Sequence, residues 1–127
     1  MKKKLTIVFT WTWVLIILVL YLMSGKAIPQ FSFSSLFQLD KLVHFTLFFV
    51  LSWLLVKSFT IQTSYPSLKV NTISKAFFLS FIYGFTLEFL QYFVPDRNFD
   101  VLDIVANTAG TFFPLFFMKK KSSEKKA

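Results

Sequence analysis

The sequence predicts an all-α membrane protein, a bundle of four transmembrane helices with both termini in the cytoplasm. The chain has 127 residues, of which 55% are hydrophobic, and its mean hydropathy of +0.62 is typical of integral membrane proteins. Four apolar segments each approach the roughly 20 residues that a helix needs to cross a ~30 Å hydrocarbon core. Lysines collect beside one end of these segments, which is the usual topology signal. We therefore expect one membrane domain covering residues 1–127.

The four expected spans cover about residues 5–23, 40–59, 72–94 and 99–118. The first follows three lysines and carries no charge, a pattern that also suits a secretory signal. Its apolar run is longer than the ~7–15 residues of a signal peptide, and no A-x-A cleavage site follows it, which favours an uncleaved span. Its aromatic residues Trp11, Trp13 and Tyr21 are ordinary for such a helix.

Orientation follows from lysine and arginine, which favour the cytoplasmic side. Three parts of the chain are rich in lysine: the N-terminus, the loop between the second and third spans, and residues 119–127. The two opposite connections hold Lys26, Lys41 and Arg97. We therefore expect a multi-pass protein of the cytoplasmic (inner) membrane, with a basic cytoplasmic tail at residues 119–127 and the turn near Arg97 outside.

The net charge of +8 comes largely from lysines that flank the apolar segments. This placement indicates contact with anionic headgroups, so membrane lipids are the expected partners and nucleic acid is not. The chain has no cysteine, which excludes disulfides, thiolate nucleophiles and cysteine-ligated metals.

Polar residues crowd the stretch EFLQYFVPDRNFDVLDIVANTAG at 88–110, although ionisable groups inside spans are rare and costly. Together with two earlier residues they lie at helical spacing on three spans: Asp40 and His44, then Glu88 and Gln91, then Asp100, Asp103 and Asn107. The deeper side chains fall roughly 5–12 Å below the outer boundary. Small residues continue the same faces and allow close packing: Ser80, Gly84, Ala106 and Gly110. Three helices thus place polar groups at one depth, which predicts a site.

Several of these residues also have an interpretation in which they serve only the fold. Asp40 is a candidate N-cap of the second span, and Asp100 with Asp103 has the spacing of a capping box. Lys41 and Arg97 have side chains long enough to reach headgroups. A polar clasp that fixes helix packing would explain the whole set without any ligand.

Carboxylates beside a histidine are the components of general acid–base chemistry. The candidate catalytic residues are His44, Glu88 and Asp103, and Glu88 lies too deep in its span to cap a helix. The candidate ligand-binding residues are Asp40, Lys41, Gln91, Arg97, Asp100 and Asn107. One imidazole with oxygen ligands would suit a hard divalent ion or zinc, but no H-E-x-x-H or similar motif is present. The sequence therefore assigns no metal, leaves any cofactor open, and offers no evident nucleophile.

The segments DKLVHF at 40–45 and 88–110 resemble the VanZ-like family of small bacterial membrane proteins. The family pattern is D-K-x-x-H-F, then E-x-x-Q, a turn with Arg, and D-x-x-D-x-x-x-N-x-x-G. It falls on Asp40, Lys41, His44, Glu88, Gln91, Arg97, Asp100, Asp103, Asn107 and Gly110. The resemblance covers about residues 40–114 and departs at Pro114, where the family often has glycine. It implies a multi-spanning membrane protein whose namesake is linked to teicoplanin resistance, and it implies no particular reaction.

Two functions are compatible with these patterns. In the first, an outward-facing polar and acidic pocket binds or modifies a cell-envelope component, such as a lipid-linked precursor or a headgroup. In the second, the protein is a non-catalytic structural or partner-binding protein. A cation- or proton-coupled carrier is disfavoured, because the inner halves of the last three spans carry no acidic residue or histidine to continue a relay, and their lysines lie near the cytoplasmic ends. The oligomeric state is left open.

Overall fold

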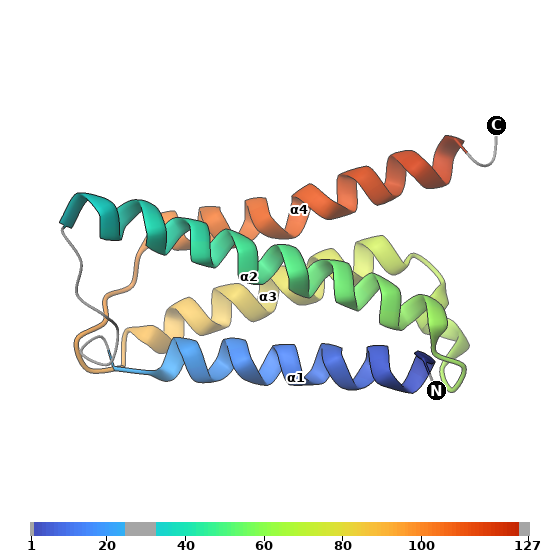
Figure 1. Ribbon diagram of the computed structural model, residues 1–127, viewed down its shortest axis with the longest axis horizontal. Helices are drawn as coiled ribbons and strands as arrows, with labels where there is room; N and C mark the ends of the chain where they lie inside the picture. Colours follow the sequence, from blue (N-terminus) through green and yellow to red (C-terminus); the bar gives the residue numbers. More distant parts are fainter. Residues whose placement is uncertain (1, 25–32, 125–127) are drawn as a thin grey trace.

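The computed structural model describes residues 2–24 and 33–124, and every regular element in those ranges is helical. The elements are α1 (Lys2–Leu22), α2 (Phe33–Ile61), the short 3₁₀ helix η2 (Pro66–Lys69), α3 (Thr72–Gln91) and α4 (Val101–Glu124). The four α-helices are all long and apolar enough to cross a membrane, which confirms the expected all-α class with four candidate transmembrane helices. The cytoplasmic placement of both termini stays a prediction. The two chain ends lie at the same end of the bundle (Figure 1).

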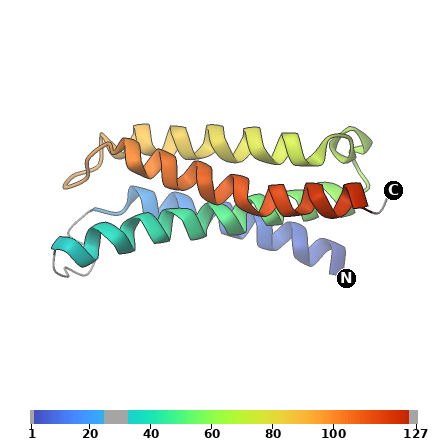
Figure 2. The same cartoon turned by 90° about the horizontal axis from the view of Figure 1, so that it is seen from above.

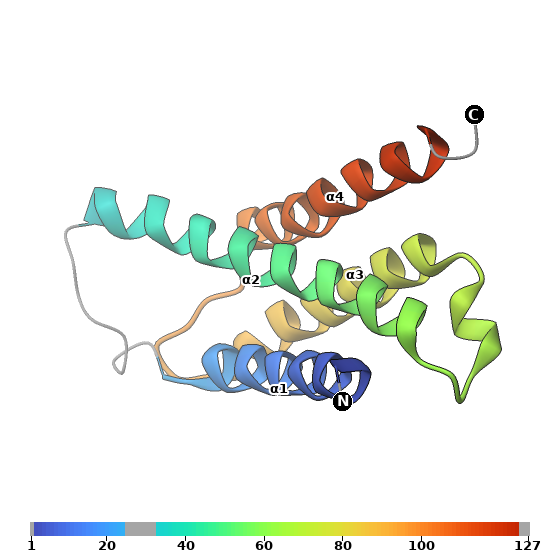
Figure 3. The ribbon, with the colours of Figure 1, turned by 45° about the vertical axis from the view of Figure 1, so that its right-hand side comes forward.

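Helices α2 and α3 lie between α1 and α4 (Figure 3), and α4 packs most extensively against α2 and also contacts α3 (Figure 2). The core beside α1 is built from fully buried side chains: Ile17, Tyr21, Phe48, Leu51 and Leu87. All four helices carry exposed large apolar side chains on their outward faces, mostly phenylalanine, leucine and valine. Such a surface suits hydrocarbon, because a bilayer does not penalise exposed apolar groups.

Helix α2 begins at Phe33, seven residues before the expected start of the second span. The interpretation of Asp40 as an N-cap is therefore wrong, since Asp40 lies two turns inside the helix. The segment FSSLFQL that precedes Asp40 contains no proline or glycine, so nothing in it stops the helix from extending past the membrane boundary.

Helix α3 ends at Gln91, three residues before the expected end of the third span. The next three residues form tight turns instead: the amides of Tyr92, Phe93 and Val94 bond to carbonyls three residues back. Pro95 disfavours helical backbone at the residue before it, and Asp96 adopts a left-handed conformation with φ 59°. Glu88 is thus one turn from the end of α3, whereas the expected span places it six residues from the end.

Helix α4 continues beyond the expected limit at residue 118 and incorporates the first residues of the basic tail. It passes through Pro114 without ending, although proline removes one helical hydrogen bond. The helix also approaches α2 closely at Gly110, where an added Cβ would overlap the backbone of Phe45. Glycine at this position therefore sets the separation of the two helices that carry most of the polar side chains.

Candidate functional site

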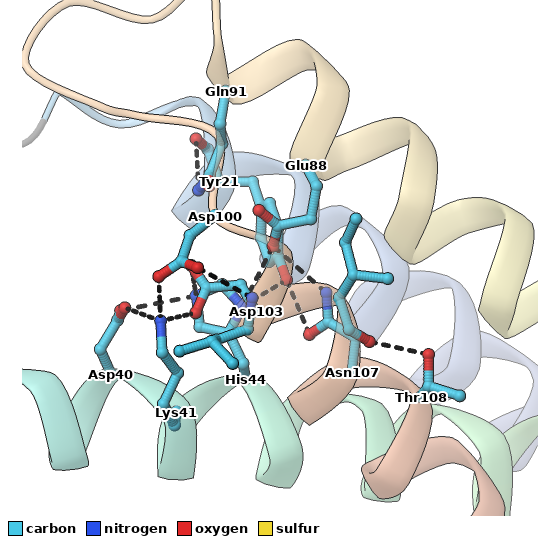
Figure 4. A network of polar contacts seen from close by, with 12 residues as sticks. Tyr21, Asp40, Lys41, His44, Glu88, Gln91, Asp100, Asp103, Asn107 and Thr108 are labelled. Atoms are coloured by element: carbon cyan, nitrogen blue, oxygen red, sulfur yellow. Dashed lines mark hydrogen bonds and ion pairs between the residues drawn. The ribbon is translucent and has the colours of Figure 1, made fainter.

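Polar side chains from all four helices meet at the end of the bundle opposite the chain termini (Figures 1 and 4). We call the following residues the polar cluster: Tyr21, Asp40, Lys41, His44, Glu88, Asp100, Asp103 and Asn107. Its interior is buried, since His44, Glu88, Asp103 and Asn107 are at most 5% exposed. The side chains of Asp40 and Asp100 are 41% and 36% exposed, so they form the open rim. The cluster is thus graded from a buried floor to an accessible edge.

The buried part of the cluster, which we call the floor, consists of Tyr21, His44, Glu88 and Asn107. Their side chains form a closed set of hydrogen bonds. The Tyr21 hydroxyl donates to Oδ1 of Asn107 at 2.9 Å, and Nδ2 of Asn107 donates to Oε1 of Glu88 at 3.2 Å. Nδ1 of His44 lies 2.9 Å from the Tyr21 hydroxyl and 3.2 Å from Oε1 of Glu88. These contacts connect α1, α2, α3 and α4, so each helix contributes one side chain to the floor.

Lys41 lies among the carboxylates of the rim. Its ammonium group is 2.6 Å from Oδ2 of Asp100 and 3.5 Å from Oδ2 of Asp40, and it also forms an ion pair with Oδ1 of Asp103. The expectation that Lys41 reaches out to headgroups is therefore wrong. Its side chain is only 19% exposed and turns toward α4, because the buried Asp103 carboxylate needs a cation near it.

The second nitrogen of His44, Nε2, points at the rim rather than the floor. It lies 3.5 Å from Oδ1 of Asp40 and 3.9 Å from Oδ2 of Asp103. The three candidate catalytic residues predicted from the sequence, His44, Glu88 and Asp103, are therefore neighbours, with His44 between the other two (Figure 4). Their wide separation along the chain gives no hint of this contact, which comes from helix packing.

Asp100 caps α4 as the sequence suggested, but the reciprocal half of the box is missing. Its Oδ1 accepts the amide of Leu102 at 2.8 Å, whereas the Asp103 side chain bonds to Lys41. Asp100 directly precedes the candidate membrane span Val101–Lys119. The hydrogen bond from the Lys41 ammonium lowers the pKa of the Asp100 carboxyl below its ordinary value.

Gln91 and Arg97 lie beside the polar cluster and contact the end of α1. Nε2 of Gln91 donates to the carbonyl of Tyr21 at 3.4 Å, and Gln91 is buried. Nε of Arg97 donates to the carbonyl of Met23 at 3.4 Å. Both side chains therefore tie the α3–α4 turn to α1 and support the cluster from its edge.

Tyr21 is the functional candidate that the sequence did not reveal. It is 2% exposed and bonds to two residues of the floor, yet one tyrosine in an apolar span follows no periodic pattern. Its position near the end of α1, at the depth of His44, is the only sequence signal that could have pointed to it.

Three buried side-chain oxygens have no hydrogen-bond partner among the described residues: Oγ of Ser80, Oε2 of Glu88 and Oγ1 of Thr111. Lone hydroxyls are tolerable, but a carboxylate oxygen at 0% exposure is costly without a partner. Oε2 of Glu88 is therefore a feature that packing alone does not explain.

A family model described as VanZ/LLP1 matches residues 3–119. The match covers all four helices and every residue of the polar cluster, including the first helix, which the resemblance read from the sequence left out. No curated protein and no solved structure matches the chain.

Proposed function

This chain belongs to the VanZ/LLP1 family, and from that premise we propose that it binds or modifies a cell-envelope component at the polar cluster. The component is a lipid headgroup or a lipid-linked precursor, and the protein lies in the cytoplasmic membrane. Binding of this component would connect the protein to glycopeptide resistance. One observation supports the proposal above all. The cluster combines the buried residues His44 and Glu88 with the accessible carboxylates of Asp40 and Asp100, which a ligand can reach.

The proposed orientation places the polar cluster on the outer side. The connection from the end of α2 through η2 to the start of α3, which includes Lys57, Lys69 and Lys75 in its sequence, lies at the bundle end that carries both termini (Figure 1). The opposite end, where α1 and α3 end and α4 begins, holds the polar cluster. Because lysine-rich connections stay in the cytoplasm, the cluster then opens toward the outer leaflet. Precursors exposed on that side are the targets of antibiotics that act outside the membrane, which is why an outward site suits a resistance function.

The charges of the polar cluster restrict the headgroup. Asp40, Asp100 and Asp103 surround a single ammonium group, and Glu88 adds a fourth carboxylate beside His44. An excess of carboxylates favours hydroxyl and amine groups and repels a bare phosphate. A phosphate would bind here only together with a cation. Headgroups with sugars or amines are therefore the first candidates.

A purely structural role is the second candidate, and a specific observation favours it. Most polar atoms of the floor are satisfied by one another, as a clasp between helices requires. Such a clasp adds little to the stability of the bundle, since interhelical hydrogen bonds in membranes contribute about 0.6 kcal/mol on average. The clasp also gives no reason for Oε2 of Glu88 to lie buried without a partner.

Lipids retained by the purified protein test the proposal. We would extract the full chain from its host membrane in mild detergent, identify the bound lipids by mass spectrometry, and compare wild type with Asp100→Asn. We expect one lipid class enriched about tenfold over its share of the membrane, corresponding to about 1.4 kcal/mol of preference. Asp100→Asn removes a rim charge but keeps the helix cap, so it should reduce the enrichment without unfolding α4.

Asp96→Asn is the matched control, because it makes the same change on an exposed turn outside the polar cluster. It should retain the enriched lipid. A wild-type lipid profile that equals the bulk membrane would contradict headgroup binding, as would equal enrichment in all three proteins.

A further inference from the structure

The side of His44 that faces the rim has the arrangement of a metal site. One ligand atom from each of Asp40, His44 and Asp103 lies within 4.8 Å of the other two. We infer that these three residues bind one divalent transition-metal ion of the zinc type, with a fourth position open toward the rim. This inference goes beyond the proposed function, since the ion can bind whether or not an envelope ligand does.

The hydrogen bonds of the floor fix where the imidazole carries its proton. The Tyr21 hydroxyl gives its only proton to Oδ1 of Asn107, and Nδ2 of Asn107 gives one to Oε1 of Glu88. Both oxygens next to Nδ1 of His44 are therefore acceptors, so Nδ1 bears a hydrogen. In the neutral imidazole the lone pair is then on Nε2.

That lone pair faces two carboxylate oxygens, an arrangement that needs a positive charge at Nε2, either a second ring proton or a bound cation. Lys41 does not supply it. Lys41 contacts Oδ2 of Asp40 and Oδ1 of Asp103, whereas Nε2 of His44 faces Oδ1 of Asp40 and Oδ2 of Asp103. Each carboxylate thus offers one oxygen to the ammonium and the other to the imidazole (Figure 4). The ligand atoms remain available while the Lys41 ion pairs stay in place.

The separations fit an ion better than direct hydrogen bonds. The distances of 3.5 and 3.9 Å from Nε2 to the two carboxylates exceed the ~2.7–3.2 Å of an N–H···O hydrogen bond. Ligands about 2.1 Å from a tetrahedral centre lie about 3.4 Å apart. The two separations from Nε2 are therefore within about 0.5 Å of the value for zinc, and the two carboxylate oxygens, which lie within 4.8 Å of each other, would draw together around the ion.

Glu88 provides the second, independent indication. A metal-bound histidine almost always donates its other ring N–H to a carboxylate, a backbone carbonyl or water, which orients the ring and raises its basicity. Oε1 of Glu88 lies 3.2 Å from Nδ1 of His44, on the side opposite the proposed ion. Glu88 is fully buried and its Oε2 has no partner, an unfavourable state for a carboxylate unless a nearby positive charge offsets it.

One imidazole with two carboxylates selects the class of ion. Imidazole suits zinc and similar transition metals better than magnesium or calcium, and three protein ligands with an open position are typical of catalytic zinc. The ion would also offset the excess of carboxylates, which otherwise repels phosphate. A phosphate-bearing headgroup would then become an acceptable ligand at the open position.

The test uses tag-free full-length protein in detergent, stripped with a chelator and then titrated with Zn²⁺ or Co²⁺. The chain has one histidine and no cysteine, so a specific site has a distinctive signature. We expect one ion per chain by elemental analysis and X-ray absorption showing one imidazole nitrogen at about 2.0–2.1 Å with oxygen ligands. No stoichiometric ion, or a shell without imidazole, would overturn the inference and leave His44 as an imidazolium.

Variants test the assignment of ligands. His44→Gln and Asp103→Asn each remove a buried ligand and should weaken binding by more than the ~10–100-fold typical of an outer partner. Asp96→Asn, the same chemical change on the exposed turn, should bind as wild type. Equal binding in wild type and His44→Gln would overturn the assignment. The absorption measurement uses wild type only, so it decides the question even if a variant fails to fold.

Discussion

The hydroxyl of Tyr21 in α1 lies 2.9 Å from Nδ1 of His44 in α2, so the first helix is joined directly to the polar cluster. This contact makes α1 part of the site. Helix α1 therefore differs from a simple membrane anchor, which any apolar helix could replace. The same hydroxyl donates to Asn107 in α4, so one oxygen atom connects three helices.

Removing that oxygen should loosen the bundle. Tyr21→Phe keeps the buried ring but leaves Nδ1 of His44 and Oδ1 of Asn107 with one partner fewer. We expect a loss of about 0.6–1.7 kcal/mol, the range measured for polar contacts between membrane helices, detected as a lower melting temperature in detergent. Tyr92→Phe is the control, because Tyr92 is 69% exposed and its change should leave the melting temperature unaltered. Equal effects of the two substitutions would show that the contact contributes nothing.

The close approach of α2 and α4 gives a second prediction. In Gly110→Ala the new methyl group would meet the backbone of Phe45, which cannot turn aside, and α2 would have to move. We expect a destabilisation of about 1–3 kcal/mol, as for other overpacked cores. In Gly84→Ala the methyl would meet ring atoms of Phe48 at 2.9 and 3.0 Å, which a small side-chain rotation relieves. Thermal unfolding should therefore rank Gly110→Ala well below Gly84→Ala, and the reverse order would contradict the packing described.

The ion pair of Asp100 predicts a pH dependence. Because the ammonium of Lys41 lowers the pKa of Asp100 in the folded state, the pair stabilises the protein above the unfolded pKa of 3.8. That contribution is lost as the pH falls through the folded pKa. Asp100→Asn keeps an N-cap but removes the pair, so wild type should be more stable at neutral pH and should lose this advantage as the pH falls below 3.8 and through the folded pKa. A difference in melting temperature that stays constant from neutral to acidic pH would refute this coupling.

The orientation is tested by reporter fusions. A reporter attached after Lys126 should be active only if it functions in the cytoplasm, because lysines accumulate at that end of the helices. A reporter inserted in the turn at residues 96–98 should show the opposite preference. An extracytoplasmic reporter active after Lys126 would invert the bundle and place the polar cluster on the cytoplasmic side.

The fold and much of the polar cluster could be predicted from the sequence because both follow from local patterns. Apolar length predicts spans, and helical spacing alone places Glu88, Asp103 and Asn107 at one depth. What could not be predicted depends on partners far along the chain. The side chain of Lys41 is long enough to reach a headgroup, so its direction cannot be predicted from the sequence around it. It turns toward Asp100 and Asp103 because α4, which is distant in the sequence, packs beside α2.

Helix ends could be predicted less well than helix positions. The serine-containing segment before Asp40 has the composition of a loop, yet it continues α2 because no residue in it breaks a helix. Helix α3 is instead shorter than expected. The apolar residues before Pro95 suggest that the span continues, whereas the chain turns after Gln91. Hydropathy describes which residues prefer lipid, and it does not locate the last hydrogen bond of a helix.

The central claim, that the polar cluster is a working site and not only a clasp, is tested most directly by Glu88→Gln. Glutamine keeps the shape of the side chain and an oxygen that accepts from Asn107 and His44, so the bundle should still assemble. If the negative charge is used for binding or chemistry, the variant should reach normal membrane abundance and melting temperature yet lose, in teicoplanin susceptibility assays, the resistance that the proposed function assigns to the wild type. A Glu88→Gln protein that is stable and as active as wild type would contradict the claim and establish the cluster as a packing device.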